Sequence, residues 1–192
     1  MRQPVRGVLV GMAIGGLAVT VAGVSAAAQT VEWPAYAADR AGTKYLPLDQ
    51  INEDTVGDLE IVWRQPIIPD AIRNGVTTRG PVGSQTTPLM AGGLLYFSTG
   101  LGTIAALEPT TGEVVWNTGP SDDERVRQTR GVAYWIEGDE RRVVATLGPK
   151  LVSLDARTGE RDAGFGEAGE VDLRLGLLRP FPAFYWNAAP II

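Results

Sequence analysis

The sequence of 192 residues contains no cysteine and no histidine. Disulfides, thiolate nucleophiles and imidazole bases are therefore excluded within this chain, as are c-type haem attachment and zinc sites built from Cys and His. Any metal would need oxygen ligands, as calcium does. The sequence also lacks a basic run, since 17 Lys and Arg stand against 22 Asp and Glu, for a net charge of −5. No nucleic-acid partner is therefore expected.

The N-terminal segment has no charged residue between Arg6 and Glu32. Its apolar stretch is rich in small residues and ends in three consecutive alanines at 26–28, which fit an A-x-A cleavage pattern. These features predict a secretory signal peptide over residues 1–28, and hence a periplasmic or secreted protein. The uncharged run is also long enough for the alternative, an uncleaved helix that anchors the protein to the inner membrane.

A repeat of about 47 residues runs through the rest of the chain. The segment YFSTGLGTIAALEPTTGE at 96–113 aligns without gaps with VVATLGPKLVSLDARTGE at 143–160. Short β-rich runs alternate with glycine-containing turns, and no period near 3.6 is sustained between residues 86 and 160. Four strands in a repeat of this length are typical of a β-propeller blade, so the expected fold is an all-β propeller.

The two Thr-Gly pairs mark equivalent corners of the repeat. Gly112 and Gly159 are expected to take positive φ at these tight turns. Trp116 ends the strand that follows the first Thr-Gly pair, in the segment EVVW at 113–116. The similar segment EIVW at 60–63 predicts an equivalent last strand over residues 59–63.

The repeat predicts one blade over about 85–131, a second over about 132–180 and a third that begins near 187, where NAAPII resembles QTTPLM at 85–90. Residues 29–192 are then the N-terminal part of a propeller. Because the smallest closed propeller has about four blades, we expect either a fragment of a longer protein, which is favoured, or a chain that pairs edge to edge with another.

The leader EWPAYAADRAGTKYLPLDQINEDTVGDLEIVWR at 32–64 resembles the opening of the pyrroloquinoline-quinone (PQQ)-dependent dehydrogenases, the quinoprotein alcohol and glucose dehydrogenases. QTTPLMAGGLLYFSTGLGTIAALEPTTGEVVW and RGVAYW continue the resemblance in order. The resemblance implies an eight-bladed propeller with PQQ on its axis, calcium beside the quinone, and oxidation of an alcohol or an aldose. Glu124 and Arg125 stand where methanol dehydrogenases have vicinal cysteines, so the glucose-dehydrogenase-like branch is favoured.

The same resemblance implies a small alcohol or sugar as substrate and a quinone or cytochrome as electron acceptor. It places the catalytic Asp and the metal-binding Glu beyond Ile192, so no catalytic residue or calcium ligand is expected within the chain, and the chain alone is expected to be inactive. The alternative from another class is a non-catalytic propeller that serves as a binding or outer-membrane assembly scaffold.

Three residues are cofactor-binding candidates by this resemblance. Arg130 in TRGVAYW matches a family arginine, and its guanidinium can bind a carboxylate of PQQ through two charge-assisted hydrogen bonds; the alternative is a surface arginine. Gln85 stands where the family usually has a glutamate, so an amide replaces the charge; the alternative is a polar residue on a loop. Asn187 aligns with a family Thr or Ser that hydrogen-bonds the cofactor; the alternative is a turn asparagine.

Trp63 and Trp116 offer flat faces on which a quinone can stack. Their equivalent places in the repeat favour a structural role instead. In the family that the sequence resembles, such tryptophans dock one blade on the next.

Overall fold

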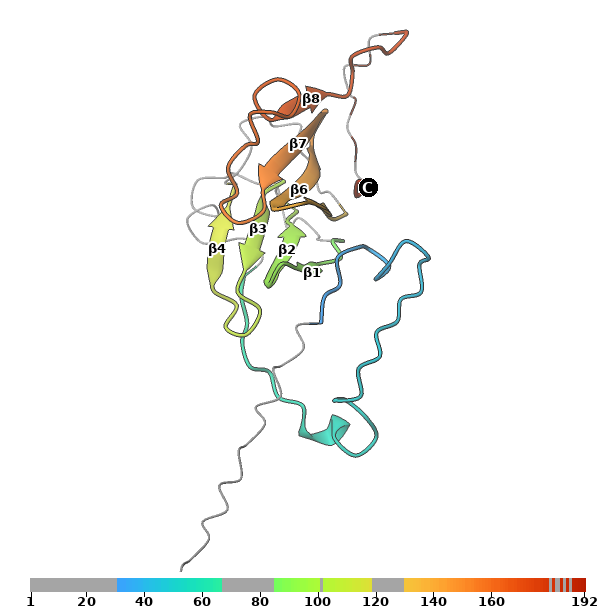
Figure 1. Ribbon diagram of the computed structural model, residues 1–192, viewed down its shortest axis with the longest axis vertical. Coiled ribbons are helices and arrows are strands. Elements are labelled where there is room, and N and C mark those ends of the chain that lie inside the picture. The colour runs from blue at the N-terminus through green and yellow to red at the C-terminus, as the bar shows by residue number, and fades with distance from the viewer. Residues whose placement is uncertain are drawn as a thin grey trace, which may run out of the picture.

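The computed structural model describes residues 31–66, 85–100, 102–118, 130–179, 181, 184, 186 and 188–192. These residues form two four-stranded antiparallel sheets, in each of which the strand order follows the chain (Figure 1). The first sheet comprises β1 (Leu89–Ala91), β2 (Leu94–Ser98), β3 (Ile104–Leu107) and β4 (Val114–Asn117). The second comprises β5 (Ala133–Glu137), β6 (Glu140–Leu147), β7 (Lys150–Asp155) and β8 (Glu170–Asp172). The all-β class predicted from the repeat is confirmed.

The leader, residues 31–66, contains a short 3-10 turn, η1 (Val56–Asp58), and otherwise runs without regular structure. Trp33 pairs with Met90 through two backbone hydrogen bonds of 2.6 and 3.0 Å, so the start of the leader lies along the free edge of β1. No helix in the part of the chain that the structure describes has the length and apolar character of a membrane span.

The Thr-Gly corner has the same geometry in both repeats. Gly112 and Gly159 have φ of +72° and +74°. Each donates its N–H over 2.9 Å to the backbone carbonyl four residues earlier, of Glu108 and Asp155 respectively. Glycine adopts this left-handed conformation without the steric cost that a Cβ would add, so the positive φ predicted at both corners is confirmed.

A carboxylate closes each of these corners. Glu108 accepts hydrogen bonds from the Thr110 hydroxyl and from the Thr111 N–H, the latter over 2.6 Å. Asp155, in the equivalent place, accepts from the N–H groups of residues 157 and 158 over 2.9 and 2.8 Å. Hydrogen bonds of this kind favour the ionised form. Those from Thr110 and Thr111 lower the pKa of Glu108 from 4.5 to about 2.

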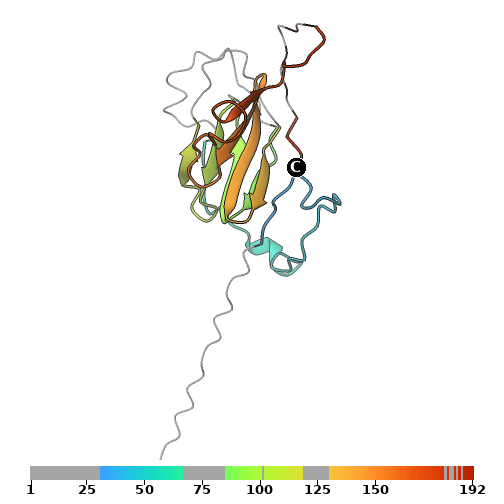
Figure 2. The same cartoon turned by 45° about the horizontal axis from the view of Figure 1, so that its top comes forward.

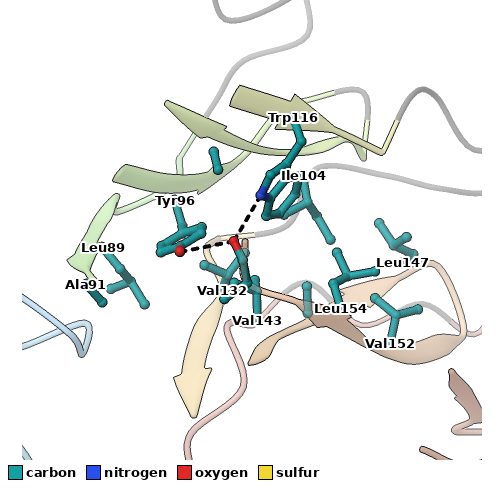
Figure 3. Close-up of a cluster of buried hydrophobic side chains, with 13 residues drawn as sticks. Leu89, Ala91, Tyr96, Ile104, Trp116, Val132, Val143, Leu147, Val152 and Leu154 are labelled. Carbon is teal, nitrogen blue, oxygen red and sulfur yellow. Dashed lines mark hydrogen bonds between the residues drawn. The ribbon is translucent and has the colours of Figure 1, made fainter. Parts of the chain in front are cut away.

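The main hydrophobic core lies between the two sheets, which stand one behind the other as neighbouring blades (Figures 2 and 3). Strand β3 is buried on both faces, because Ile104 and Ala106 point into this core while Ala105 and Leu107 point the other way, into a smaller cluster that Trp63 of the leader covers. The main core is made of Leu89, Ala91, Tyr96, Ile104, Ala106, Trp116, Val132, Val143, Ala145, Leu147, Val152, Leu154 and Ala156.

Trp116 joins the first sheet to the second. Its indole N–H donates to the Ala156 carbonyl over 2.9 Å, and the Tyr96 hydroxyl donates to the same oxygen over 3.1 Å (Figure 3). The indole ring lies against Gly159, where an added Cβ would be 2.6 Å from the ring. These contacts confirm that Trp116 docks one repeat on the next.

Trp63 repeats this contact one blade earlier. Its indole N–H donates to the Pro109 carbonyl over 2.9 Å, and a Cβ on Gly112 would lie 2.5 Å from its ring. The expected strand at 59–63 is wrong for this structure, because these residues adopt no strand. A strand exists only through hydrogen bonds to a neighbouring strand, and no described segment pairs with this one.

Replacing Gly159 with Ala is expected to weaken the docking of Trp116. The new Cβ would overlap the indole ring, and the φ of +74° adds backbone strain. We expect the free energy of unfolding, measured by denaturant titration, to fall by about 2–4 kcal/mol. Gly138→Ala is the matched control, because its φ is +56° and nothing lies within 4 Å of its added Cβ. The control should lose only about 1–2 kcal/mol, and equal losses would contradict the docking role.

Glu108 is expected to make stability depend on pH. Because its pKa is lowered in the folded chain, the stabilisation from its ionised form is fully present above about pH 4.5 and is lost as the pH falls toward 2. Glu108→Gln should therefore lower the melting temperature at pH 7, and the difference from the unchanged protein should shrink below pH 4.5. Glu113→Gln is the control, since no hydrogen bond to its carboxylate is present in the described part. A difference that stays constant down to pH 2 would rule out this contribution.

Candidate functional site

Two of the three predicted site residues lie at one edge of the structure. Gln85 precedes β1 and Arg130 precedes β5, and these two strands are neighbours across the interface between the sheets. Thr87 and Gly131 form a parallel bridge, in which the Thr87 N–H donates to the Arg130 carbonyl over 3.3 Å. This bridge holds the starts of β1 and β5 together.

The side chains of Gln85 and Arg130 are both exposed at this edge. Neither side chain makes a hydrogen bond or an ion pair within the described residues. The guanidinium has five donors and the amide has both donors and an acceptor. Both groups are therefore available to a polar ligand that lies against the starts of β1 and β5.

The start of the third expected blade lies beside the same edge. A Cβ added to Gly131 would lie 3.5 Å from the Ala189 Cβ and 3.5 Å from the Thr87 carbonyl oxygen. Ala189 is thus within contact distance of the residue that follows Arg130. Asn187, the third predicted site residue, lies outside the described residues.

Hydroxyl groups that sequence reasoning did not single out lie behind this edge. The Thr86 and Ser98 hydroxyls are 3.1 Å apart, and the Thr86 oxygen also accepts from the Ser98 N–H over 3.3 Å. The hydroxyls of Thr99 and Thr103, both buried, are 2.6 Å apart. These bonds tie the segment that carries Gln85 to the end of β2. In the sequence, these hydroxyl groups are indicated by the Ser and Thr residues at the end of the apolar strand β2 and directly after it.

The family model for PQQ, the glucose/ethanol/alcohol dehydrogenase beta-propeller domain, matches residues 33–192. The chain belongs to this family. The matched range includes both sheets and all three predicted site residues, so the resemblance drawn from the leader and the repeats is confirmed.

Curated quinoproteins resemble this chain along most of its length. It is 28% identical over 184 residues to quinoprotein glucose dehydrogenase A from Acinetobacter calcoaceticus, which covers 83% of the chain and 22% of the relative. It is 32% identical over 141 residues to quinohemoprotein alcohol dehydrogenase from Comamonas testosteroni, which covers 70% of the chain and 18% of the relative. The chain therefore spans about a fifth of the length of these relatives.

A solved structure shares the arrangement of the sheets. The crystal structure of the quinohemoprotein alcohol dehydrogenase from Comamonas testosteroni matches with a TM-score of 0.64 and 27% identity, over 86% of this chain and 22% of that chain. The two sheets of this chain are therefore neighbouring blades of a propeller.

The described residues do not form a metal site. Across the described ranges, no group of three or more His, Cys, Asp or Glu side chains is placed to hold a metal ion. The expectation that calcium is bound by residues beyond Ile192 stays a prediction. At the edge of Gln85 and Arg130, the described residues present a guanidinium, an amide and backbone groups.

Proposed function

We propose that this chain is the N-terminal part of an exported quinoprotein oxidoreductase that oxidises an alcohol or an aldose, such as glucose, with PQQ. Membership of the PQQ dehydrogenase propeller family supports this chemistry. Relatives named as a glucose dehydrogenase and as an alcohol dehydrogenase support the two substrate classes. Because the chain spans about a fifth of those relatives, the activity belongs to the whole protein.

The bridge between Thr87 and Gly131 is the observation on which the proposed cofactor site depends. It brings the segments of Gln85 and Arg130 to one edge, where both side chains are exposed and have no partner in the described part. PQQ carries carboxylates, and a guanidinium binds a carboxylate through strong, often paired, charge-assisted hydrogen bonds. The residues present therefore fit the cofactor.

In this proposal Arg130 holds a carboxylate of PQQ and Gln85 supplies a neutral hydrogen-bonding group beside it. Asn187 is a third contact of the same site. PQQ supplies the redox chemistry, because its quinone accepts the electrons that the substrate loses. The catalytic carboxylate and the calcium ligands are proposed to lie beyond Ile192, and a quinone or a cytochrome is the proposed electron acceptor.

Arg130→Ala in the whole protein is expected to weaken PQQ binding. Loss of charge-assisted hydrogen bonds costs about 1.5–3 kcal/mol, which corresponds to a dissociation constant about 10–150 times higher. Quenching of tryptophan fluorescence during PQQ titration measures this constant. Arg40→Ala, which changes an exposed arginine of the leader, is the control and should bind as the unchanged protein does.

Two outcomes of this titration have different meanings. Unchanged affinity in Arg130→Ala would refute the role of Arg130 while leaving the family chemistry intact. A whole protein that binds no PQQ and oxidises neither glucose nor ethanol would refute the proposed function and favour a non-catalytic scaffold.

Export is proposed from the N-terminal segment, which lies outside the described residues. A signal peptide over residues 1–28 should be removed, so that the exported protein begins at Gln29. N-terminal sequencing of protein from the periplasm or the medium measures this directly. Recovery of the uncut chain from the inner membrane would show the anchored alternative instead.

A further inference from the structure

The Thr86 hydroxyl lies at a junction of segments behind the edge that carries Gln85 and Arg130. It accepts from the Ser98 N–H over 3.3 Å and lies 3.1 Å from the Ser98 hydroxyl. A Cβ added to Gly131 would lie 3.9 Å from the same oxygen. Thr86 therefore contacts the end of β2 and lies beside the residue that follows Arg130.

Thr86 and its neighbour Gln85 differ in exposure. Gln85 is exposed, whereas Thr86 is half-buried and its partner Ser98 is completely buried. A buried hydrogen-bonding group that loses its partner costs more free energy than an exposed one. The contact between Thr86 and Ser98 therefore fixes the backbone next to Gln85, while the Gln85 side chain stays accessible.

The next residue along the chain extends this anchor to Arg130. The Thr87 N–H donates to the Arg130 carbonyl over 3.3 Å, and Thr87 forms a parallel bridge with Gly131. Thr86 is held by the first blade, and Thr87 holds the start of the second. The backbones of Gln85 and Arg130 are thus connected to β2 through two consecutive threonines.

The second blade carries a buried hydroxyl at the equivalent place. Ser98 pairs with Ile104 across β2 and β3. Thr146 pairs with Leu151, the residue that aligns with Ile104 in the repeat. The Thr146 hydroxyl donates to the Trp186 carbonyl over 3.5 Å. In both blades, a buried hydroxyl near the end of the second strand therefore holds a segment that leads into the first strand of a blade.

We propose that Thr86 is a positioning residue of the PQQ site, which holds the backbones of Gln85 and Arg130 in place before the cofactor binds. This role rests on the proposed function, because it concerns the same site. Groups that are already in place lose less conformational freedom when a ligand binds. Loss of the Thr86 hydroxyl should therefore weaken PQQ binding, although the hydroxyl is engaged by Ser98 and not by the ligand.

Thr86→Val in the whole protein removes the hydroxyl and keeps the size of the side chain. We expect the dissociation constant of PQQ, measured by quenching of tryptophan fluorescence, to rise about three- to tenfold. Thr86→Ser retains the hydroxyl and should bind PQQ as the unchanged protein does.

Thr111→Val is the matched control for this substitution. The Thr111 hydroxyl also accepts from a backbone N–H, that of Glu113, over 3.2 Å. It lies beyond the far end of β3 from Ser98, since Ser98 pairs with Ile104 at the start of that strand. The control should leave the affinity for PQQ unchanged.

Hydrogen exchange without PQQ measures the positioning by itself. Mass spectrometry of the peptide spanning residues 85–91 should show faster exchange in Thr86→Val than in the unchanged protein. The reason is that the bridge from Thr87 opens more often when the preceding residue is not held. The same peptide should exchange at the unchanged rate in Thr111→Val.

Ser98→Ala shows whether Thr86 acts through Ser98. The effects of Thr86→Val and Ser98→Ala on the dissociation constant of PQQ should not add in the double variant, because both substitutions break the same contact. Fully additive effects would overturn the proposed route through Ser98.

The outcomes separate this role from the proposed function. Unchanged PQQ affinity in Thr86→Val, or equal weakening in Thr111→Val, would overturn the positioning role and leave the proposed function intact. If the unchanged whole protein binds no PQQ, the proposed function fails and the positioning role fails with it.

Discussion

The carbonyl oxygen of Ala156 is the point on which the arrangement of the two blades depends. It accepts hydrogen bonds from both the Trp116 indole and the Tyr96 hydroxyl, which come from two strands of the first blade (Figure 3). Its own peptide is held in turn, because the Ala156 N–H donates to the Arg141 carbonyl over 3.0 Å. Two donors on one buried acceptor define both the separation and the orientation of the sheets, and an error in either would leave a buried polar group unpaired.

The same constraint positions two polar regions at opposite ends of the inner strands. At one end, the alignment of β1 with β5 lets Thr87 bridge to Gly131, which gathers the residues proposed to hold PQQ. At the other end, it sets the ring of Tyr134 against that of Tyr96 and opens a pocket between the blades. The core between these ends is apolar and closely packed, so a shift of one blade against the other would disturb both regions together.

Propeller blades are similar in scaffold but need not be similar in surface. Trp63 and Trp116 meet equivalent carbonyls and equivalent glycines, so the docking contact is repeated from leader to first blade and from first blade to second. Three arginines at this interface do not repeat in this way. Arg130 lies at the edge of the proposed cofactor site, whereas Arg141 and Arg157 line the pocket at the far end of the same interface. Scaffold positions carry the fold, and the residues proposed to hold PQQ lie between them.

The sequence by itself determined the strands of both repeats, the corners at Gly112 and Gly159 and the family, because strand alternation, glycine conformation and ordered motifs are local properties of the chain. It could not decide residues 59–63, whose strand pattern has no described neighbour to pair with. Only the tertiary structure decided that Tyr96 and Trp116 share one acceptor and that the Tyr134 ring packs on the Tyr96 ring. Those contacts join residues far apart in the chain across an interface, and no local spacing encodes which atoms meet there.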